Sequence, residues 1–162
     1  ADICAVLDMA LQDFNGMRER EGAKLSADIL SRAGTIEALT AQVEAQSPKT
    51  VAEYRGRLEN KMKEVLQNTQ IDESRILTEA AIFADKVAVD EETVRLHSHL
   101  SQLRTLLEQD GPMGRKLDFL IQEFNREANT IGSKCNDLET ARHVIDIKAE
   151  IEKIREQVQN IE

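Results

Sequence analysis

Aromatic residues, proline and cysteine are scarce in this chain of 162 residues, and each scarcity limits the folds or functions to be expected. It has four phenylalanines, one tyrosine and no tryptophan, and it is rich in Leu, Ala, Glu, Gln and Lys, which favours helices over sheets. Proteins that bind single-stranded RNA usually stack its bases on aromatic side chains, so composition alone does not favour RNA binding. Cys4 and Cys135 form no CxxC pair. A disulfide framework is therefore not expected, and the predicted location is the reducing cytoplasm.

Long apolar runs and net positive charge are lacking as well. No apolar run approaches the ~20 residues that a membrane-spanning helix needs, and no signal peptide is recognised, so no membrane contact is expected. Thirty acidic and 21 basic residues give a net charge of −9. Affinity for nucleic acid comes mostly from Lys and Arg, so an RNA-binding role would need a local basic patch, a metal or another domain. The chain starts at Ala1 within a helical pattern, and we expect a fragment of a longer protein.

Apolar residues recur at the spacing of amphipathic helices along the whole chain, which predicts an all-α, elongated bundle of long antiparallel helices. Ser47 and Pro48 have the character of an N-cap and a first-turn proline. Asp90 and Asn136 are the expected N-caps of two later helices. The expected elements are one helix, or a pair joined near Gly22, over 3–45, and further helices over 48–66, 72–83, 90–109, 114–131 and 136–161.

The segment from Gly114 to Lys134 has an unusual polar edge beside its apolar face. Glu123 and Glu127 are four residues apart, Lys116 lies on the same edge, and Arg126 lies beside it. Two carboxylates at this spacing repel each other on a helix, so a cation or a metal ion is expected between them. The alternative is a salt-bridged rim around an ordinary helical core.

A second polar line occurs on the helix expected over 90–109. Glu92, Arg95 and His99 are spaced i, i+3 and i+7, so they share one edge of its leucine stripe. The turn at 110–112 contains Gly and Pro and should set this helix antiparallel to the next one. The two polar lines are then predicted to face each other across one groove. His97 is expected to point elsewhere, into solvent.

No phosphate loop, zinc-finger spacing, nucleophile elbow or HExxH motif occurs, so the charged groove is the candidate for chemistry. Phosphodiester cleavage needs carboxylates that hold a divalent metal, cations that stabilise the transition state and a group that moves protons. The predicted catalytic residues are His99, Glu92, Arg95, Glu123 and Glu127. The predicted ligands of a divalent metal, Mn²⁺ or Mg²⁺, are Glu123, Glu127 and Glu92. The predicted RNA or phosphate contacts are Lys116, Arg126, Lys134 and Arg115.

Four stretches resemble the C-terminal domain of the YicC/YloC family of bacterial endoribonucleases, once labelled stress-induced proteins. They are GRKLDFLIQEFNREANTIGSK (Gly114–Lys134), FNGMREREGAKL (Phe14–Leu25), EAAIFADKVAVDEETVRLHSHL (Glu79–Leu100) and IKAEIEKIREQVQNIE (Ile147–Glu162). The resemblance covers nearly the whole chain, and Gly114–Lys134 is its most specific block. His97 departs from it, because an arginine is more typical there.

This resemblance implies an RNA endonuclease, metal-assisted and acting as a ring-like homo-oligomer such as a hexamer, with an N-terminal domain that is absent here. It does not say which residues cleave RNA; those assignments come from the charged groove. Periodicity, acidity and few aromatics fit a second hypothesis equally well, a non-catalytic helical scaffold or oligomerisation domain.

Overall fold

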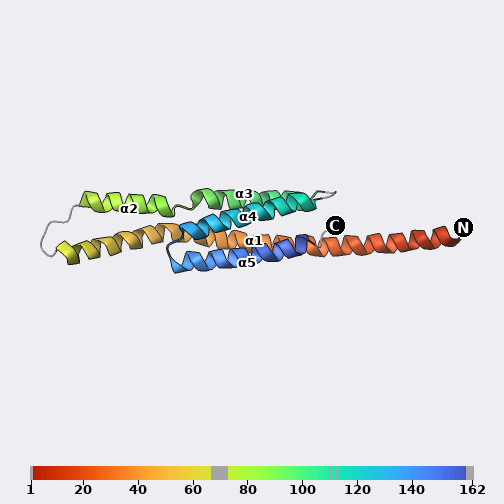
Figure 1. Ribbon diagram of the computed structural model, residues 1–162. Helices are drawn as coiled ribbons and strands as arrows, with labels where there is room; N and C mark the ends of the chain where they lie inside the picture. Colours follow the sequence, from red (N-terminus) through yellow and green to blue (C-terminus); the bar gives the residue numbers. More distant parts are fainter. Residues whose placement is uncertain (1, 67–72, 110, 112, 160–162) are drawn as a thin grey trace.

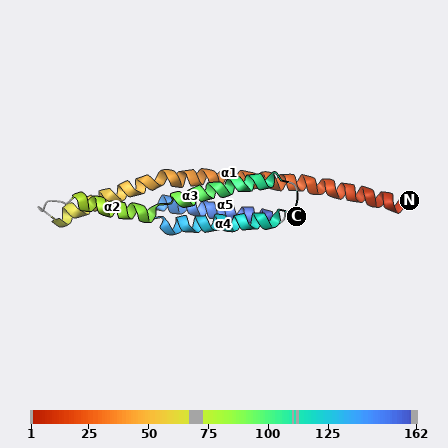
Figure 2. The same ribbon diagram turned by 90° about the horizontal axis from the view of Figure 1, so that it is seen from above.

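The computed structural model describes residues 2–66, 73–109, 111 and 113–159, and these ranges contain five helices and no strand. The helices are α1 (Asp2–Leu66), α2 (Glu73–Val87), α3 (Asp90–Leu107), α4 (Gly114–Lys134) and α5 (Leu138–Val158). All of them run along one long axis, as Figures 1 and 2 show. The predicted all-α, elongated bundle is therefore confirmed.

Helix α1 is the spine on which the other helices assemble. It packs against α5, α3 and α2, while α4 packs against α3 and α5. The colours in Figure 1 show that α3 and α4 run in opposite directions, as predicted. The core between α1, α3, α4 and α5 is almost entirely aliphatic, with one aromatic ring. Its fully enclosed side chains include Ile29, Ile36, Leu96, Leu100, Leu103, Leu117, Phe124, Ile131, Ile147, Ile151 and Ile154.

Helix α2 extends the bundle along the second half of α1 (Figures 1 and 2). Its apolar face buries Ile76, Ala80, Phe83 and Val87. Phe83 stacks on Tyr54 of α1, with ring centroids 3.8 Å apart and planes 7° from parallel. Two of the few aromatic residues therefore fasten α2 to α1, outside the main core.

Helix α1 passes through Pro48 without ending, so the predicted helix boundary at Ser47 and Pro48 is wrong. The single helix is also the correct choice of the two predicted for 3–45. A proline inside a helix costs about 3 kcal/mol, because it lacks an N–H and its ring crowds the preceding turn. Val43 and Thr50 are buried on either side of the proline, so packing on both sides keeps the helix continuous. In Figures 1 and 2 the helix changes direction in its second half.

Two predicted N-caps are also wrong. Val89, which is buried in the core, occupies the N-cap of α3, and Asp90 lies in the first turn, where the helix dipole favours its charge. Helix α5 is capped by Asp137 instead of Asn136: the Asp137 carboxylate accepts a hydrogen bond from the Thr140 N–H at 2.8 Å. Both residues can cap a helix, and the negative charge of Asp137 adds a favourable interaction with the dipole.

The remaining helix ends differ from the predicted ends by a few residues. Helix α2 extends past 83 to Val87, whose burial adds an apolar contact, and α3 ends at Leu107 instead of 109. Helix α4 continues past 131 to Lys134, and α5 begins at Leu138 instead of 136. Predicted residues 72, 160 and 161 lie outside the described part of the chain.

The first part of α1 projects beyond the bundle (Figures 1 and 2). Every side chain from 3 to 15 is exposed, including Ile3, Val6, Leu7 and Phe14. In the described part of the chain, none of the helices combines the length and the apolar character needed to cross a bilayer.

Candidate active site

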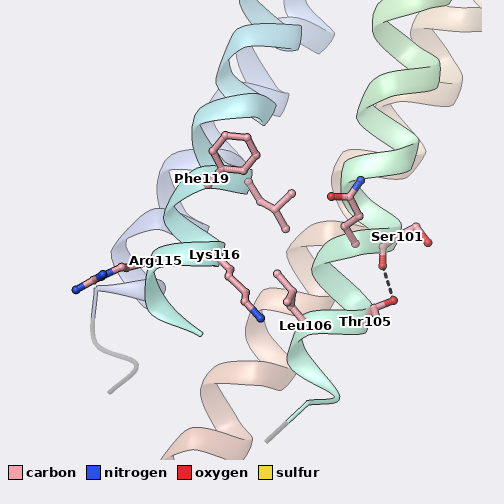
Figure 3. Close-up of a pocket in the computed structure, with 8 residues that line it drawn as sticks. Ser101, Thr105, Leu106, Arg115, Lys116 and Phe119 are labelled. Carbon is pink, nitrogen blue, oxygen red and sulfur yellow. Dashed lines mark hydrogen bonds between the residues drawn. The ribbon is translucent and has the colours of Figure 1, made fainter. Parts of the chain in front are cut away.

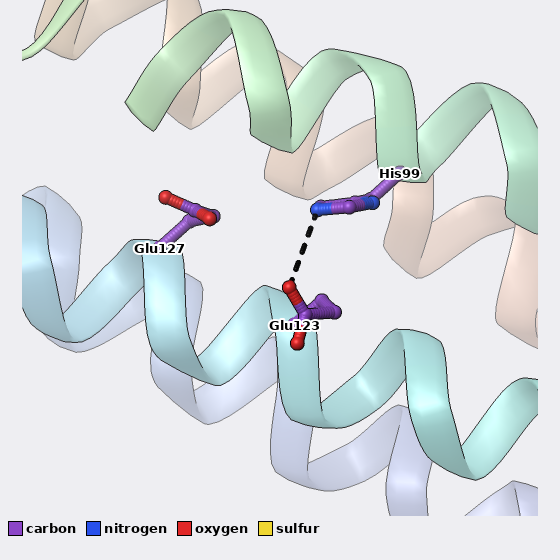
Figure 4. A group of neighbouring side chains, drawn as sticks. All are labelled: His99, Glu123 and Glu127. Atoms are coloured by element: carbon purple, nitrogen blue, oxygen red, sulfur yellow. Dashed lines mark ion pairs between the residues drawn. The ribbon is translucent and has the colours of Figure 1, made fainter. Parts of the chain in front are cut away.

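The predicted polar lines of α3 and α4 do face each other, and they meet at two levels along the helices. At one level the Nε atom of Arg95 on α3 lies 3.2 Å from Oε2 of Glu127 on α4. At the next level Nε2 of His99 lies 4.0 Å from Oε2 of Glu123, as Figure 4 shows. Antiparallel packing produces this pattern, because each step toward the end of α3 is matched by a step toward the start of α4.

Glu92 closes one end of this polar groove with a buried carboxylate. The residue is only 2% exposed, and both of its carboxylate oxygens contact Nζ of Lys134, at 2.9 and 3.0 Å. Arg95 lies 3.4 Å from one of the same oxygens. A carboxylate is buried at low cost only when cations and hydrogen bonds compensate for its lost hydration. Glu92 and Lys134 thus form an ion pair. Lys134, predicted to contact phosphate, instead binds a carboxylate of the protein itself.

Arg95 connects the two buried carboxylates of the groove. It binds Glu127, which is 3% exposed, and it pairs with both Glu91 and Glu92 on its own helix. Burial alone would lower the pKa of the guanidinium, but the hydrogen bond and the charge of Glu127, with Glu91, raise it above its ordinary value. Arg95 therefore stays charged and holds the Glu127 carboxylate in place.

His99, Glu123 and Glu127 form the part of the groove that could bind a metal ion. Each offers one ligand atom, and these atoms all lie within 4.8 Å of one another. Figure 4 shows the imidazole of His99 lying between α3 and α4, on the same side as the two carboxylates. Ligands that share one divalent ion each lie ~2.0–2.2 Å from it, so a modest closure of these side chains would suffice.

The imidazole of His99 has an unusual environment. Both ring nitrogens are buried, and neither has a hydrogen-bond partner within the described residues. The ring packs edge-on against Phe124, with centroids 6.3 Å apart. A buried polar atom without a partner costs about 1–3 kcal/mol, so such atoms usually serve a ligand, an ion or a reaction. His99 is thus the residue of the groove whose polar atoms are available for chemistry.

The remaining predicted residues lie outside this cluster. Arg126 is largely exposed, and its NH1 atom lies 3.7 Å from Glu123. Lys116 and Arg115 are about two turns away at the start of α4, where they line a separate pocket with Phe119. Glu92, a predicted metal ligand, is not part of the three-residue group.

Two contributions were missed by reasoning from the sequence. His97 is half-buried, and its Nε2 lies 3.2 Å from Oε1 of Glu44 on α1, so the expected exposure is wrong. These residues are 53 positions apart, and no local pattern links them. Phe119 was also missed, although an exposed phenylalanine beside the apolar face of α4 is a visible signal.

Fold and site together define an all-helical domain with an acidic, histidine-containing groove between two antiparallel helices. The family model described as endoribonuclease YicC-like, C-terminal, matches residues 43–162, and the chain belongs to this family. It is 44% identical to a probable endoribonuclease YicC of Clostridioides difficile, over 98% of this chain and 56% of that protein. It is 37% identical to a probable endoribonuclease YicC of Haemophilus influenzae, over 99% of this chain and 55% of that protein. The chain thus spans about half the length of these relatives.

Proposed function

We propose that this chain is the helical part of a divalent-metal-assisted endoribonuclease, and that the groove between α3 and α4 is its cleavage site. The observation that carries the proposal is His99, whose two ring nitrogens are buried without a hydrogen-bond partner among the described residues and lie next to Glu123 and Glu127. The names of the two relatives and of the family support RNA as the substrate.

The groove residues divide into ligands and supports in this proposal. His99, Glu123 and Glu127 hold the metal, and Arg95 fixes Glu127 through their contact at 3.2 Å. Glu92 acts one step further away, because its contacts with Lys134 and Arg95 position Arg95. A divalent ion here would supply Lewis acidity, lowering the pKa of a bound water and neutralising phosphate charge. Arg126, exposed at the rim, is available to a phosphate oxygen.

The ligand types favour manganese over magnesium. Magnesium prefers an octahedral shell of oxygen ligands and keeps several waters, whereas imidazole is typical of the later transition metals. A set of one imidazole and two carboxylates lies between these extremes. Mn²⁺ accepts such a mixed set, so we expect it to support cleavage better than Mg²⁺.

We also propose a cytoplasmic, ring-like homo-oligomer. The resemblance implies a ring such as a hexamer, and the apolar side chains exposed between residues 3 and 15 support burial of this part of α1 against another domain or subunit. A neighbouring subunit could also complete the groove over His99.

The test uses the full-length parent protein and end-labelled RNA, with Mn²⁺, with Mg²⁺ or with chelator. Wild type should cut the RNA with metal and stop with chelator. His99→Ala and Glu123→Gln should each lose at least tenfold in rate, since each removes a ligand. Glu79→Gln, an exposed carboxylate on α2, is the matched control and should cut normally.

Three results would count against the proposal. Undiminished cleavage in both variants would place the site elsewhere. Cleavage that persists in chelator would show that the reaction does not need a metal. A parent protein that cuts no RNA with any metal would favour the scaffold hypothesis. Circular dichroism and size-exclusion chromatography must show that the variants fold and assemble as wild type does.

A further inference from the structure

A separate open pocket of about 510 Å³ lies between α3 and α4, between the His99 cluster and the turn that joins the two helices. Its α3 wall carries Ser101, Gln102, Thr105 and Leu106, and its α4 wall carries Arg115, Lys116, Phe119 and Leu120. Figure 3 shows Lys116 extending from α4 toward α3, whereas Arg115 turns away from the space. The volume is in the range typical of small-molecule and cofactor pockets, which would readily accommodate a nucleobase.

The pocket combines an aromatic wall with local positive charge. Phe119 is 59% exposed although it is one of only four phenylalanines in the chain. Neither Arg115 nor Lys116 forms an ion pair with another residue of the described chain. An exposed phenylalanine is costly to hydrate, and it becomes useful when a flat apolar group stacks on it.

The start of α4 adds to this positive potential. Its first turn contains no acidic residue and no side chain caps it, while Arg115 and Lys116 both lie there. Cations at a helix N-terminus oppose the helix dipole, so this arrangement does not stabilise the helix by itself. A phosphate at the same place would be favoured by the helix dipole and by the charge of Lys116, which points toward α3 (Figure 3).

The pocket is also in line with the proposed cleavage site. Phe119 is four residues and Lys116 seven residues before Glu123, on the same edge of α4. At a rise of ~1.5 Å per residue, they lie about 6 and 10 Å from Glu123 along the helix axis. About 10 Å corresponds to roughly three stacked nucleotides at ~3.4 Å each.

From this geometry we propose that the pocket binds single-stranded RNA beside the cut: Phe119 stacks one base, two or three nucleotides from the scissile phosphate, and Lys116 contacts the phosphate next to that base. This inference rests on the proposed endoribonuclease function, because that function supplies RNA as the occupant. It assigns a binding role to Phe119 and a defined position to Lys116.

Binding and cleavage can be separated by removing the metal. The full-length parent protein is titrated with fluorescein-labelled oligoadenylate in chelator, and the dissociation constant is read from fluorescence anisotropy. Phe119→Ala should weaken binding about 5- to 150-fold, which corresponds to the ~1–3 kcal/mol per base that aromatic stacking contributes. Phe119→Tyr keeps the ring and should bind within about twofold of wild type. Ile145→Ala, which removes an equally exposed apolar side chain from α5, should bind as wild type does.

A second measurement locates the base. Oligoadenylates with one abasic nucleotide at successive positions should each be tested against wild type and Phe119→Ala. At one position, the abasic nucleotide should weaken binding to wild type but not weaken binding to Phe119→Ala any further. The abasic nucleotide and the Phe119→Ala substitution then remove the same stacking contact. Lys116→Ala should reduce the slope of log affinity against log salt by about 0.7, the value for one phosphate contact on a single strand.

The outcomes distinguish this inference from the proposed function. Equal binding by wild type and Phe119→Ala, with no abasic position coupled to Phe119, would overturn the inference while leaving metal-dependent cleavage untouched. Loss of binding in Phe119→Ala would support it, even if the groove near His99 proved not to cut. A change in subunit number in Phe119→Ala, with unchanged RNA affinity, would show instead that the pocket is an interface between copies of the chain.

Discussion

Replacing Lys134 with methionine should destabilise the fold sharply, because it leaves the Glu92 carboxylate buried with one weak partner. Both contacts from Lys134, at 2.9 and 3.0 Å, disappear, and only the Arg95 contact at 3.4 Å remains. Breaking a buried ion pair from one side costs about 3–5 kcal/mol. Lys134 itself is a third exposed and Arg95 stays, so we expect a loss of about 2 kcal/mol in the free energy of unfolding.

Chemical denaturation followed by circular dichroism would measure this loss directly. For a domain of this size about 2 kcal/mol corresponds to a fall of ~4–8 °C in Tm. Lys153→Met is the matched control: its Nζ also contacts a carboxylate, that of Glu150, but the lysine is half exposed, so its removal should cost at most ~0.5 kcal/mol.

A double variant tests the reason as well as the size of the effect. Glu92→Leu combined with Lys134→Met removes both charges, and a buried ion pair can often be exchanged for apolar side chains without loss. The double variant should therefore regain most of the stability that Lys134→Met loses. The reasoning fails if Lys134→Met costs less than ~0.5 kcal/mol, or if the second change adds its own penalty.

Two further predictions concern Pro48 and the start of α5. Pro48→Ala should stabilise the protein by about 1–2 kcal/mol in a denaturant titration, since the ring is exposed and alanine restores a helical N–H; a loss of stability would show that the proline is needed to bend α1. Asp137→Ala should cost about 1–2 kcal/mol at neutral pH, because Asp137 accepts hydrogen bonds from the Thr140 N–H and the Thr50 hydroxyl. Burial alone would raise the pKa of Asp137, but these hydrogen bonds lower it below its ordinary 3.8. Its contribution is therefore complete above that value and is lost as pH falls through the lower folded pKa. The difference in unfolding free energy between Asp137→Ala and wild type should shrink in acid, and a constant difference from pH 7 to 2 would contradict this.

Much of the fold follows from periodicity, and the wrong predictions come from purely local rules. The facing polar lines were predictable because the stripes of α3 and α4 fix which edges meet, and Gly111, at φ +110°, makes the reversal between them. The predicted helix boundary at Pro48 was wrong because proline is a strong local signal, whereas the burial of Val43 and Thr50 depends on helices far along the chain. Tertiary packing outweighs such local preferences.

The candidate site was predictable in its members and less so in their pairing. Lys134 binds Glu92 only because α4 continues one turn beyond its predicted end. The ring nitrogens of His99 lack a hydrogen-bond partner among the described residues because of how α3 and α4 pack around the ring, and no spacing rule contains that information. Residue type and face therefore give the candidates, and burial decides which of them stay available to a ligand.

The acidity of the chain is compatible with RNA binding because its charges are distributed unevenly along the groove. Glu92 and Glu127, the buried carboxylates, are compensated by Lys134 and Arg95, so they do not repel a phosphate with their full charge. Arg115 and Lys116, which form no ion pair with a described residue, lie at the other end, on the first turn of α4. In the proposed arrangement, an RNA strand is attracted at Lys116 and meets the proposed metal ligands further along. Because few cations contribute, this proposal predicts a low nonspecific affinity and a binding that depends on the Phe119 stack and on the metal site acting together.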